Sequence, residues 1–330
     1  GAALALQMVI NYEEGGEKSV LHGDDRSESF LTEHITTPKI GERNLTAESL
    51  WEYGSRVGFW RLWRLFTQRK MPITVYGVAM AMGRNPEAVT AMNEAGGEIA
   101  THGMRWNGEP PADEAGERAE IIETLRLHEE LCGQKALGWY NRSSARTYRL
   151  LSEIGGMLYF AHNYPDDLPF WADVAGKPEL FVPYTLEAND MRFAVANGFG
   201  DGEEFFRYLR DTFDVLYAEG IAGMPRMMTY GAQEYVIAPE MTYIMLGGDH
   251  CIDDGLCVHT LLGAVHHHHT VDIAVRSHRA NRRGVRRRTG VLAQIEGVVE
   301  RRVGRQGLPQ RRAACFSQRR HAHAGLARPV

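Results

Sequence analysis

Acidic residues and glycines directly follow the first apolar segment of the sequence. The run from Leu4 to Ile10 is typical of a buried strand, and Asn11-Tyr12-Glu13-Glu14-Gly15-Gly16-Glu17 comes after it. Adjacent carboxyl groups at the end of a buried strand are costly unless they share a proton, a cation or a polar substrate. The segment therefore indicates either an acid–base pair, Glu13 and Glu14, or a solvated acidic turn.

Polar and aromatic residues also follow three later strand-like segments. The clusters are His102-Gly103-Met104-Arg105-Trp106, Trp139-Tyr140-Asn141-Arg142 and Asp166-Asp167. Singly, each has a structural explanation, such as core packing for His102 and Trp106 or a surface ion pair for Arg142. Clusters at the same end of successive strands are typical of an α/β barrel, whose strands point their carboxyl ends into one mouth. We therefore expect the four clusters to line a common site.

Alternating strand-like and helix-like segments must position these residues. Strands are predicted at 4–10, 73–78, 98–101, 136–140, 158–161, 180–183 and 226–230, and helices at 46–68, 86–95, 113–131, 147–154 and 202–219. This alternation predicts a (β/α) barrel or a doubly wound sheet. No glycine-rich dinucleotide or Walker signature follows a strand, so nucleotide binding is disfavoured.

The predicted helix 46–68 has two unusual features. Thr46 is the expected cap, and Leu50, Tyr53, Val57, Arg61 and Leu65 form the expected stripe. Gly54 and Gly58 share a face, which would permit a close approach of another segment at some cost in helix propensity. The polar stretch 18–44 before this helix is long for a compact domain unless it covers a site.

Composition favours a reduced, cytoplasmic protein. The 330 residues include four cysteines without the spacing of a disulfide framework. No apolar run approaches the roughly 20 residues that span a bilayer, so no membrane association is expected. Because the first strand begins almost at residue 1, we expect a further N-terminal segment in the natural protein.

The net charge of −5 hides a strong asymmetry along the chain. From Val271 onward there are 15 Arg against three acidic residues, whereas the preceding part carries 22 basic and 39 acidic side chains. A basic arm can bind nucleic acid, but this one lacks Lys and interleaved aromatic residues and follows the run His266 to His269. We interpret residues 231–330 as a divergent Arg/His-rich tail, frame-shifted or disordered, and do not expect nucleic-acid binding.

Long, distributed motifs run through the first 230 residues: residues 11–17, Gly41-Glu42-Arg43-Asn44, Glu52-Tyr53-Gly54-Ser55-Arg56, Thr101-His102-Gly103-Met104-Arg105-Trp106, Gly138-Trp139-Tyr140, Asp166-Asp167-Leu168-Pro169-Phe170-Trp171 and Asn189-Asp190-Met191-Arg192-Phe193. Together they resemble the cofactor-independent allantoinases of the polysaccharide deacetylase (NodB-like) superfamily. The resemblance implies a catalytic domain at 1–230 with a distorted (β/α) barrel. It also implies hydrolysis of a C–N bond of a small ureide, allantoin to allantoate, by a homo-oligomer without a cofactor.

The resemblance also bears on metal binding. Deacetylases of the superfamily carry an Asp-Asp pair and an H-x-x-x-H motif that supply a base and a metal site. Here Glu13 and Glu14 stand at the Asp-Asp positions, His102 at the first histidine and Trp106 at the second. Glu14 and His102 alone are fewer ligands than the three that a catalytic zinc usually has.

Amide hydrolysis suggests a role for each candidate residue. Glu13 is the expected base, with Glu14 raising its proton affinity. His102 would polarise the carbonyl or protonate the leaving nitrogen, and Arg142 would hold ureide oxygens. The remaining candidates, for substrate binding, are Trp106, Trp139, Tyr140, Asp166 and Asp167.

One departure from the family pattern leaves other functions open. A Leu-His-Cys-Arg-like motif normally follows the strand at Met227-Met228, but this chain has Thr229-Tyr230-Gly231-Ala232-Gln233. His162 or His250 could supply the missing imidazole. The alternatives are a metal-dependent polysaccharide (chitin-like) N-deacetylase, with Zn²⁺ or another divalent ion on Glu14 and His102, and a non-catalytic member that lacks the last histidine.

Overall fold

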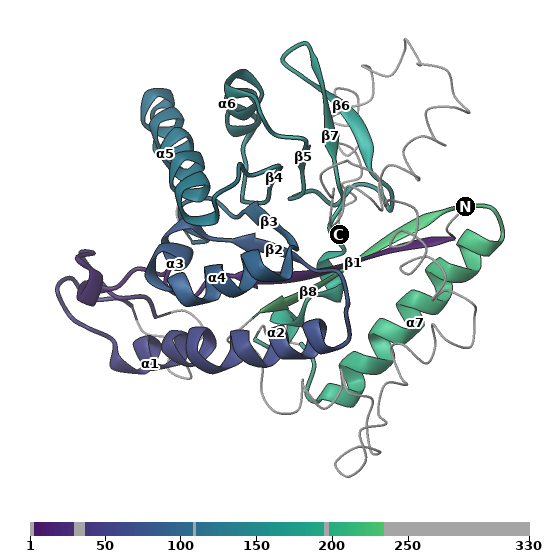
Figure 1. Cartoon of the computed structure of the whole chain (residues 1–330), viewed down its shortest axis with the longest axis horizontal. Coiled ribbons are helices and arrows are strands. Elements are labelled where there is room, and N and C mark those ends of the chain that lie inside the picture. Colours follow the sequence, from purple (N-terminus) through teal and green to yellow (C-terminus); the bar gives the residue numbers. More distant parts are fainter. Residues whose placement is uncertain (1–2, 30–36, 108–109, 195–197, 234–330) are drawn as a thin grey trace, which may run out of the picture.

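A mixed eight-stranded sheet forms the centre of the protein (Figure 1). The computed structural model describes residues 3–29, 37–107, 110–194 and 198–233. The strands are β1 (Leu4–Tyr12), β2 (Thr74–Gly77), β3 (Glu98–Thr101), β4 (Gly138–Trp139), β5 (Tyr159–Phe160), β6 (Phe170–Val174), β7 (Lys177–Phe181) and β8 (Arg226–Gln233). Their spatial order is β6-β7-β5-β4-β3-β2-β1-β8.

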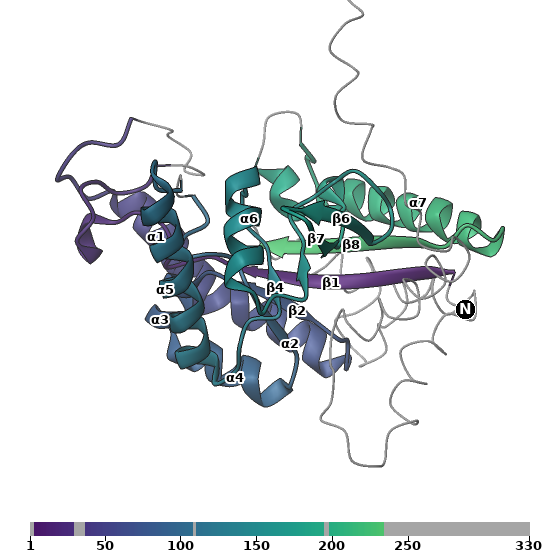
Figure 2. The same cartoon turned by 90° about the horizontal axis from the view of Figure 1, so that it is seen from above.

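All neighbouring strands run parallel except the antiparallel pair β6 and β7. The sheet curls into an open half-barrel whose two edges, within the described residues, are β6 and β8 (Figure 2). This confirms the predicted distorted (β/α) barrel. The carboxyl ends of β1 to β5 and β8 therefore lie at one end of the sheet, which we call the mouth.

Helices cover the outer face of the sheet (Figures 1 and 2). They are α1 (Leu45–Tyr53), α2 (Phe59–Gln68), α3 (Ala79–Arg84), α4 (Pro86–Ala95), α5 (Glu114–Cys132), α6 (Ala145–Ile154) and α7 (Gly202–Ile221). Asn85, Asp113, Ser144 and Asp201 each accept a backbone N–H at the start of a helix. These caps supply a partner to one orphan donor per helix, as their residue types predict.

Side chains of β1 alternate between two apolar layers. Met8, Ile10 and Tyr12 join the outer layer, which packs against α1, α2 and α7. Gln7, Val9 and Asn11 point inward, where Gln7 and Asn11 reach the hydroxyl groups of Tyr76 and Tyr184. The interior thus combines apolar packing with tyrosine hydroxyls.

The helix predicted over 46–68 differs from expectation in its cap and its buried face. The cap is Asn44, whose side chain accepts the N–H of Ala47 at 3.1 Å, and not Thr46. The buried face contains Trp51, Phe59, Leu62 and Phe66, whereas Tyr53 of the predicted stripe is exposed. The reason is a π-helical turn at Gly54–Gly58, which joins α1 to α2 and shifts the helical period.

Two elements were absent from the sequence-based expectations. The helix α3 follows β2 directly, and β6 forms a hairpin with β7, which starts at Lys177 and not at Leu180. A turn with positive φ at Ala175 and Gly176 connects the hairpin. An antiparallel pair of this kind breaks the simple alternation of strand and helix.

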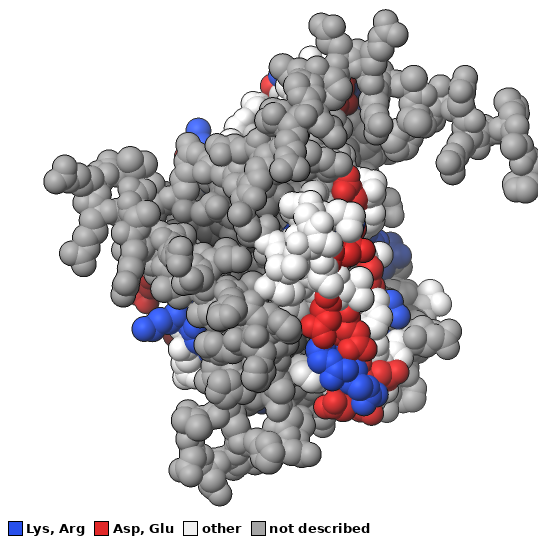
Figure 3. Space-filling model, turned by 90° about the vertical axis from the view of Figure 1, so that its right-hand side faces the viewer, with Lys and Arg blue, Asp and Glu red and all other residues white. Residues whose placement is uncertain are grey.

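The described part of the chain ends at Gln233, so β8 runs three residues past the predicted domain boundary at Tyr230. The Arg/His-rich tail, including His250 and His266 to His269, otherwise lies outside the described residues. No helix among the described residues is long and apolar enough to cross a membrane. Figure 3 shows acidic and basic side chains lying next to each other on the described part of one side face.

Candidate active site

The mouth brings Glu13 and His102 into direct contact. Glu13 follows β1 and His102 follows β3, and the Nε2 atom of His102 lies 3.1 Å from the Oε1 atom of Glu13. Both residues are 5% exposed. The other ring nitrogen of His102, Nδ1, is buried without a hydrogen-bond partner among the described residues. A buried carboxylate held by an imidazole is an arrangement that can accept a proton from water.

A tight turn fixes the backbone that carries Glu13. The N–H of Gly16 donates to the carbonyl of Glu13 at 2.8 Å, and Gly15 has a φ of +104°, which favours glycine. Arg105 donates to the carbonyls of Gly16 and Glu17, at 3.3 and 3.0 Å, and to Asp24 at 2.7 Å. Arg105, three residues after His102, therefore ties the two halves of the pair together.

Glu14 points to the outer layer and packs on the π-helical turn. A methyl group added at Gly54 would lie 2.5 Å from the Oε1 atom of Glu14, so only glycine fits there. Neither carboxyl oxygen has a hydrogen-bond partner among the described residues. Burial, with the nearby charges of Glu13 and Glu17, raises the pKa of Glu14 well above its usual value. The shift favours the protonated, neutral form of this side chain.

Tyr140 forms a wall of the mouth beside the pair. Its ring stacks on Tyr76 with a centroid distance of 4.4 Å and meets His102 edge-on at 4.7 Å. Tyr184 lies 5.1 Å from the same ring, and Asn11 and Asn189 both donate to the hydroxyl group of Tyr184. Tyr140 is 8% exposed and Tyr76 covers one face of its ring, so only the remaining part of its surface can contact a planar heterocycle.

Arg142 lies at the rim with His162 and Tyr164. Arg142 is exposed, and its positive charge adds to burial in lowering the pKa of His162, whereas burial outweighs this charge at Tyr164 and raises the pKa of that hydroxyl group. His162 follows β5, and its ring contacts Tyr140 edge-on at 5.3 Å. The rim therefore carries a cation next to the aromatic wall, as expected for a group that holds oxygen atoms of a substrate.

Asp190 is a site residue that sequence reasoning missed. It is fully buried, accepts the backbone N–H of Gln233 at 2.8 Å, and lies close enough to Glu13 for that charge, after burial, to raise its pKa. It sits in the 3₁₀-helical turn Asp190–Phe193, outside any strand. The only signal in the sequence was its place within the motif Asn189-Asp190-Met191-Arg192-Phe193.

The two predicted tryptophans lie in packed layers and do not line the mouth. The ring of Trp106 packs at a tilt against Trp51 of α1, with a centroid distance of 5.5 Å, and belongs to the outer apolar layer. Trp139 packs with Leu150 and Leu151 of α6, and its indole N–H donates to Ser143 at 3.1 Å. Of the three predicted aromatic walls, the structure places Tyr140 alone next to His102.

Asp166 and Asp167 lie at the opposite end of the sheet. The carbonyl of Asp167 accepts the N–H of Met227, and its carboxylate is 3.7 Å from Arg226, the first residue of β8. Asp166 accepts the N–H of Leu168. After β5 the chain turns back along the sheet before it enters the β6–β7 hairpin, so these acids are not brought to Glu13.

The carboxyl end of β8 presents no histidine within the described residues. A methyl group added at Gly231 would lie 1.7 Å from the Tyr184 hydroxyl group, so a side chain there is excluded. Gln233 lies beside Asn11 in the sheet, and its side-chain oxygen is buried without a partner among the described residues. Asp190 and Gln233 occupy the space at this strand end.

The metal site implied for deacetylases of the superfamily does not fit the residues present. Within the described residues, no group of three or more His, Cys, Asp and Glu side chains is arranged to hold a metal ion. Glu14 and His102, the ligands expected for a metal-dependent deacetylase, point in different directions. Glu14 faces Gly54, whereas His102 contacts Glu13. Trp106, which the resemblance aligns with the second histidine, is packed in the outer apolar layer and supplies no ligand.

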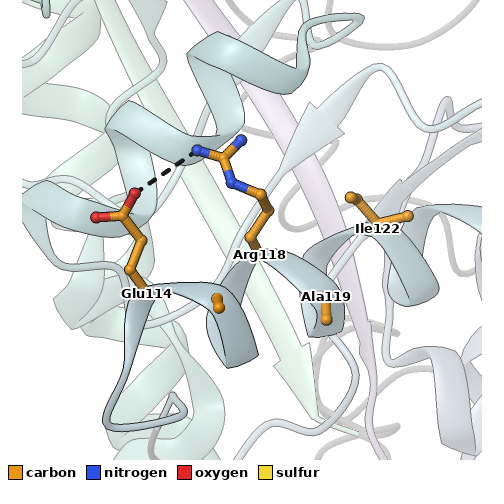
Figure 4. A pocket seen from close by; sticks show the side chains of 5 residues that line it. Glu114, Arg118, Ala119 and Ile122 are labelled. Atoms are coloured by element: carbon orange, nitrogen blue, oxygen red, sulfur yellow. Dashed lines mark ion pairs between the residues drawn. The ribbon is translucent and has the colours of Figure 1, made fainter.

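A hollow lies on the exposed face of α5, away from the mouth. Glu114, Ala115, Arg118, Ala119 and Ile122 line it, and an ion pair joins Glu114 to Arg118 (Figure 4). Arg118 also pairs with Glu153 of α6. Because its charged groups already pair with one another, this hollow offers no unpaired charge for chemistry.

Known proteins resemble the chain over most of its described length. Residues 45–152 match the family model described as polysaccharide deacetylase. A relative described as a putative polysaccharide deacetylase of Schizosaccharomyces pombe is 41% identical over 248 residues, which are 69% of this chain and 77% of the relative.

Several solved structures are also similar to this chain. A probable polysaccharide deacetylase from Pseudomonas aeruginosa PAO1 is 50% identical with a TM-score of 0.70, over 74% of this chain and 83% of that one. PuuE allantoinase is 44% identical with a TM-score of 0.69, over 84% and 86%. A putative polysaccharide deacetylase from Mycobacterium smegmatis, 18% identical with a TM-score of 0.61 over 87% and 95%, supports the fold.

Proposed function

The chain belongs to the polysaccharide deacetylase family of hydrolases, and from this premise we propose that it opens the ring amide of a cyclic ureide, allantoin, to give allantoate. The observation that carries the proposal is the buried contact between Glu13 and His102 without a third metal ligand beside it. The 44% identity to PuuE allantoinase over 84% of the chain supports the choice of substrate.

The proposed reaction begins with Glu13 as the base. Its carboxylate, held by the Nε2–H of His102, takes a proton from water while the water oxygen attacks the ring carbonyl. As Glu13 becomes protonated, the Nε2–H bond of His102 passes from its carboxylate to the resulting oxyanion. The C–N bond then breaks, and the proton held by Glu13 passes to the leaving nitrogen. Burial of the pair strengthens these interactions relative to water.

Surrounding residues have supporting roles in this proposal. Tyr140 stacks on the flat ring, and Arg142 at the rim binds ureide oxygens through its planar guanidinium group. Arg105 holds the turn that carries Glu13 and acts only through it. Asp190 keeps the end of β8 in place and adds a further carboxyl group near Glu13.

A second candidate is N-deacetylation of a polysaccharide, because the Schizosaccharomyces pombe and Pseudomonas aeruginosa relatives carry that description. The two functions differ in the residues that they demand. A metal-dependent deacetylase needs about three protein ligands, whereas the ring-opening proposal uses the Glu13–His102 pair alone.

The test is hydrolysis of allantoin by the purified full chain, with and without a strong chelator and with zinc added back. We expect ring opening that the chelator does not reduce. Chitin oligosaccharides assayed under the same conditions provide the comparison substrate. Deacetylation that requires added metal would replace the proposal by the second candidate, and no turnover of either substrate would support a non-catalytic member.

A further inference from the structure

His162 is held firmly at the mouth but has no role in the reaction as described above. It follows Ala161, whose N–H donates to the carbonyl of Trp139 at 2.9 Å at the end of the β4–β5 ladder. The hydroxyl group of Tyr148 donates to the carbonyl of His162 at 3.2 Å. Because Asn163 in turn donates to that hydroxyl group, at 3.1 Å, the backbone of His162 is fixed on both sides.

The ring of His162 lies on the same tyrosine as the ring of His102. Tyr140 meets His102 edge-on at 4.7 Å and an interplanar angle of 87°, and it meets His162 at 5.3 Å and 72°. The two imidazoles therefore flank one aromatic wall. A planar substrate on that wall would have the Glu13–His102 pair at one side and His162 at another.

The two nitrogens of the His162 ring differ in their surroundings. The Nε2 atom lies 2.9 Å from the hydroxyl oxygen of Tyr164. Among the described residues, Nε2 is the only atom of this ring with a hydrogen-bond partner. The Nδ1 atom is not one of the fully buried polar atoms that lack a partner. A tyrosine that donates to Nε2 leaves the ring proton on Nδ1, since the bond made by one nitrogen decides the state of the other.

The charge state of His162 follows from its neighbours. Burial, with the positive charges of His102 and Arg142, lowers the pKa of His162 to about 4. Burial also raises the pKa of Tyr164, which keeps its hydroxyl proton available. At pH 7 the ring is therefore neutral and can donate one N–H bond, whereas it cannot serve as a charged acid.

We infer that His162 is a substrate-binding residue whose Nδ1–H, fixed by Tyr164, donates a hydrogen bond to a carbonyl oxygen of the ureide across the Tyr140 wall from the Glu13–His102 pair. The inference rests on the proposed function and adds to it a second polar contact from a different strand end. It gives the rim an N–H donor next to the cation of Arg142, so that two oxygens of one ureide can be held at once.

Two variants distinguish the contributions of the two ring nitrogens of His162. In His162→Asn the amide group stands near the position of Nδ1 and retains the donor, whereas in His162→Gln it reaches the position of Nε2 and retains only the contact with Tyr164. We expect kcat/KM for allantoin to stay within about threefold in His162→Asn and to fall about tenfold in His162→Gln, mainly through KM, the effect of one neutral hydrogen bond.

Tyr164→Phe supplies an independent readout. It removes the group that fixes the ring proton on Nδ1, so we expect an intermediate rise in KM with kcat almost unchanged. Tyr208→Phe on α7 is the matched control and should leave both constants unaltered. Equal losses in His162→Asn and His162→Gln, with the folded state intact by circular dichroism, would show a purely structural role and overturn the inference.

Failure of the proposed function gives a different result. In that case the unmodified chain does not open allantoin under any condition, and the inference is decided by NMR of the His162 ring during titration with hydantoin. Ring resonances that shift in the unmodified chain and less in Tyr164→Phe would support a ligand contact at Nδ1. Resonances that do not shift would overturn it.

Discussion

Charged side chains gather both at the mouth of the sheet and on the outer face of α5 and α6, but the two groups differ in burial and in pairing. On the α5–α6 face, four residues form a closed network of ion pairs: Glu114, Arg118, Arg149 and Glu153. Their side chains are between 35% and 48% exposed. At the end of β1, Glu13 and Glu14 are at most 5% exposed, and neither has an arginine partner among the described residues.

The difference shows where the protein accepts an energetic cost. Exposed ion pairs are solvated and screened, so they neither cost nor contribute much. Buried carboxyl groups lose their hydration, and this loss is offset only in part when a neutral or weakly basic group is the partner. Such groups are retained where their proton affinity is used, as the mouth suggests and the α5–α6 face does not.

The largest test of the comparison is Glu13→Gln. The amide has the shape of the carboxylate but cannot accept the proton from water, so we expect kcat to fall about 10²- to 10⁴-fold. Ring opening is followed by the formation of allantoate, and circular dichroism confirms that the variant is folded. Turnover within threefold of the unmodified chain would remove Glu13 from the mechanism and make the mouth resemble the α5–α6 face.

Glu14→Gln tests the buried acid that does not contact His102. Because the pKa of Glu14 is raised on folding, the folded chain binds more protons than the unfolded chain above pH 4.5. The free energy of unfolding of the unmodified chain should therefore decrease as the pH rises from 4.5, and Glu14→Gln should abolish this part of the decrease. The advantage of the variant should widen with pH in urea unfolding curves.

A parallel set of urea curves for both proteins checks the sign. An advantage that shrinks as the pH rises would mean that Glu14 is ionised in the folded chain. It would then need a partner like those on the α5–α6 face.

Glu153→Gln should have the smallest effect. Arg118 and Arg149 lower the pKa of Glu153, which is the opposite direction to Glu14, but the group is exposed. We expect the midpoint of thermal unfolding to change by no more than about 2 °C, and less in high salt. A large, salt-independent loss would show that this network stabilises the fold and would weaken the contrast with the mouth.

The sequence carries much of the fold because its local signals agree with the packing. The β3 prediction matches the observed Glu98–Thr101, and Asn85 with Gly96 correctly bounds α4. Parallel strands point their carboxyl ends to one side, so the rule that placed Glu13 near His102 holds for strands within the alternating region. The family motifs add the same information from a resemblance.

The rule that strand ends lie together placed residues wrongly where the chain no longer alternates between strand and helix. After β5 the chain turns back toward the start of β8, and Asp166 and Asp167 go with it. Residue type could not separate a wall of the mouth from a packed layer, because Trp106 and Trp139 bury as much surface as Tyr140. Asp190 reaches the site through tertiary packing, since it lies in a short 3₁₀ turn that no strand or α-helix period predicts.

The π-helical turn between α1 and α2 also sets the rotational phase of the two helices. The N–H of Phe59 donates to the carbonyl of Gly54, five residues earlier, so the turn holds one residue more than an α-helix would. Deleting any one residue of the turn would restore the α-helical spacing and rotate α2 by about 100° relative to α1. Phe59 and Phe66 would then lose their packing against the sheet, or Gly54 would lose its contact with Glu14. The number of residues between α1 and α2 therefore cannot change by even one.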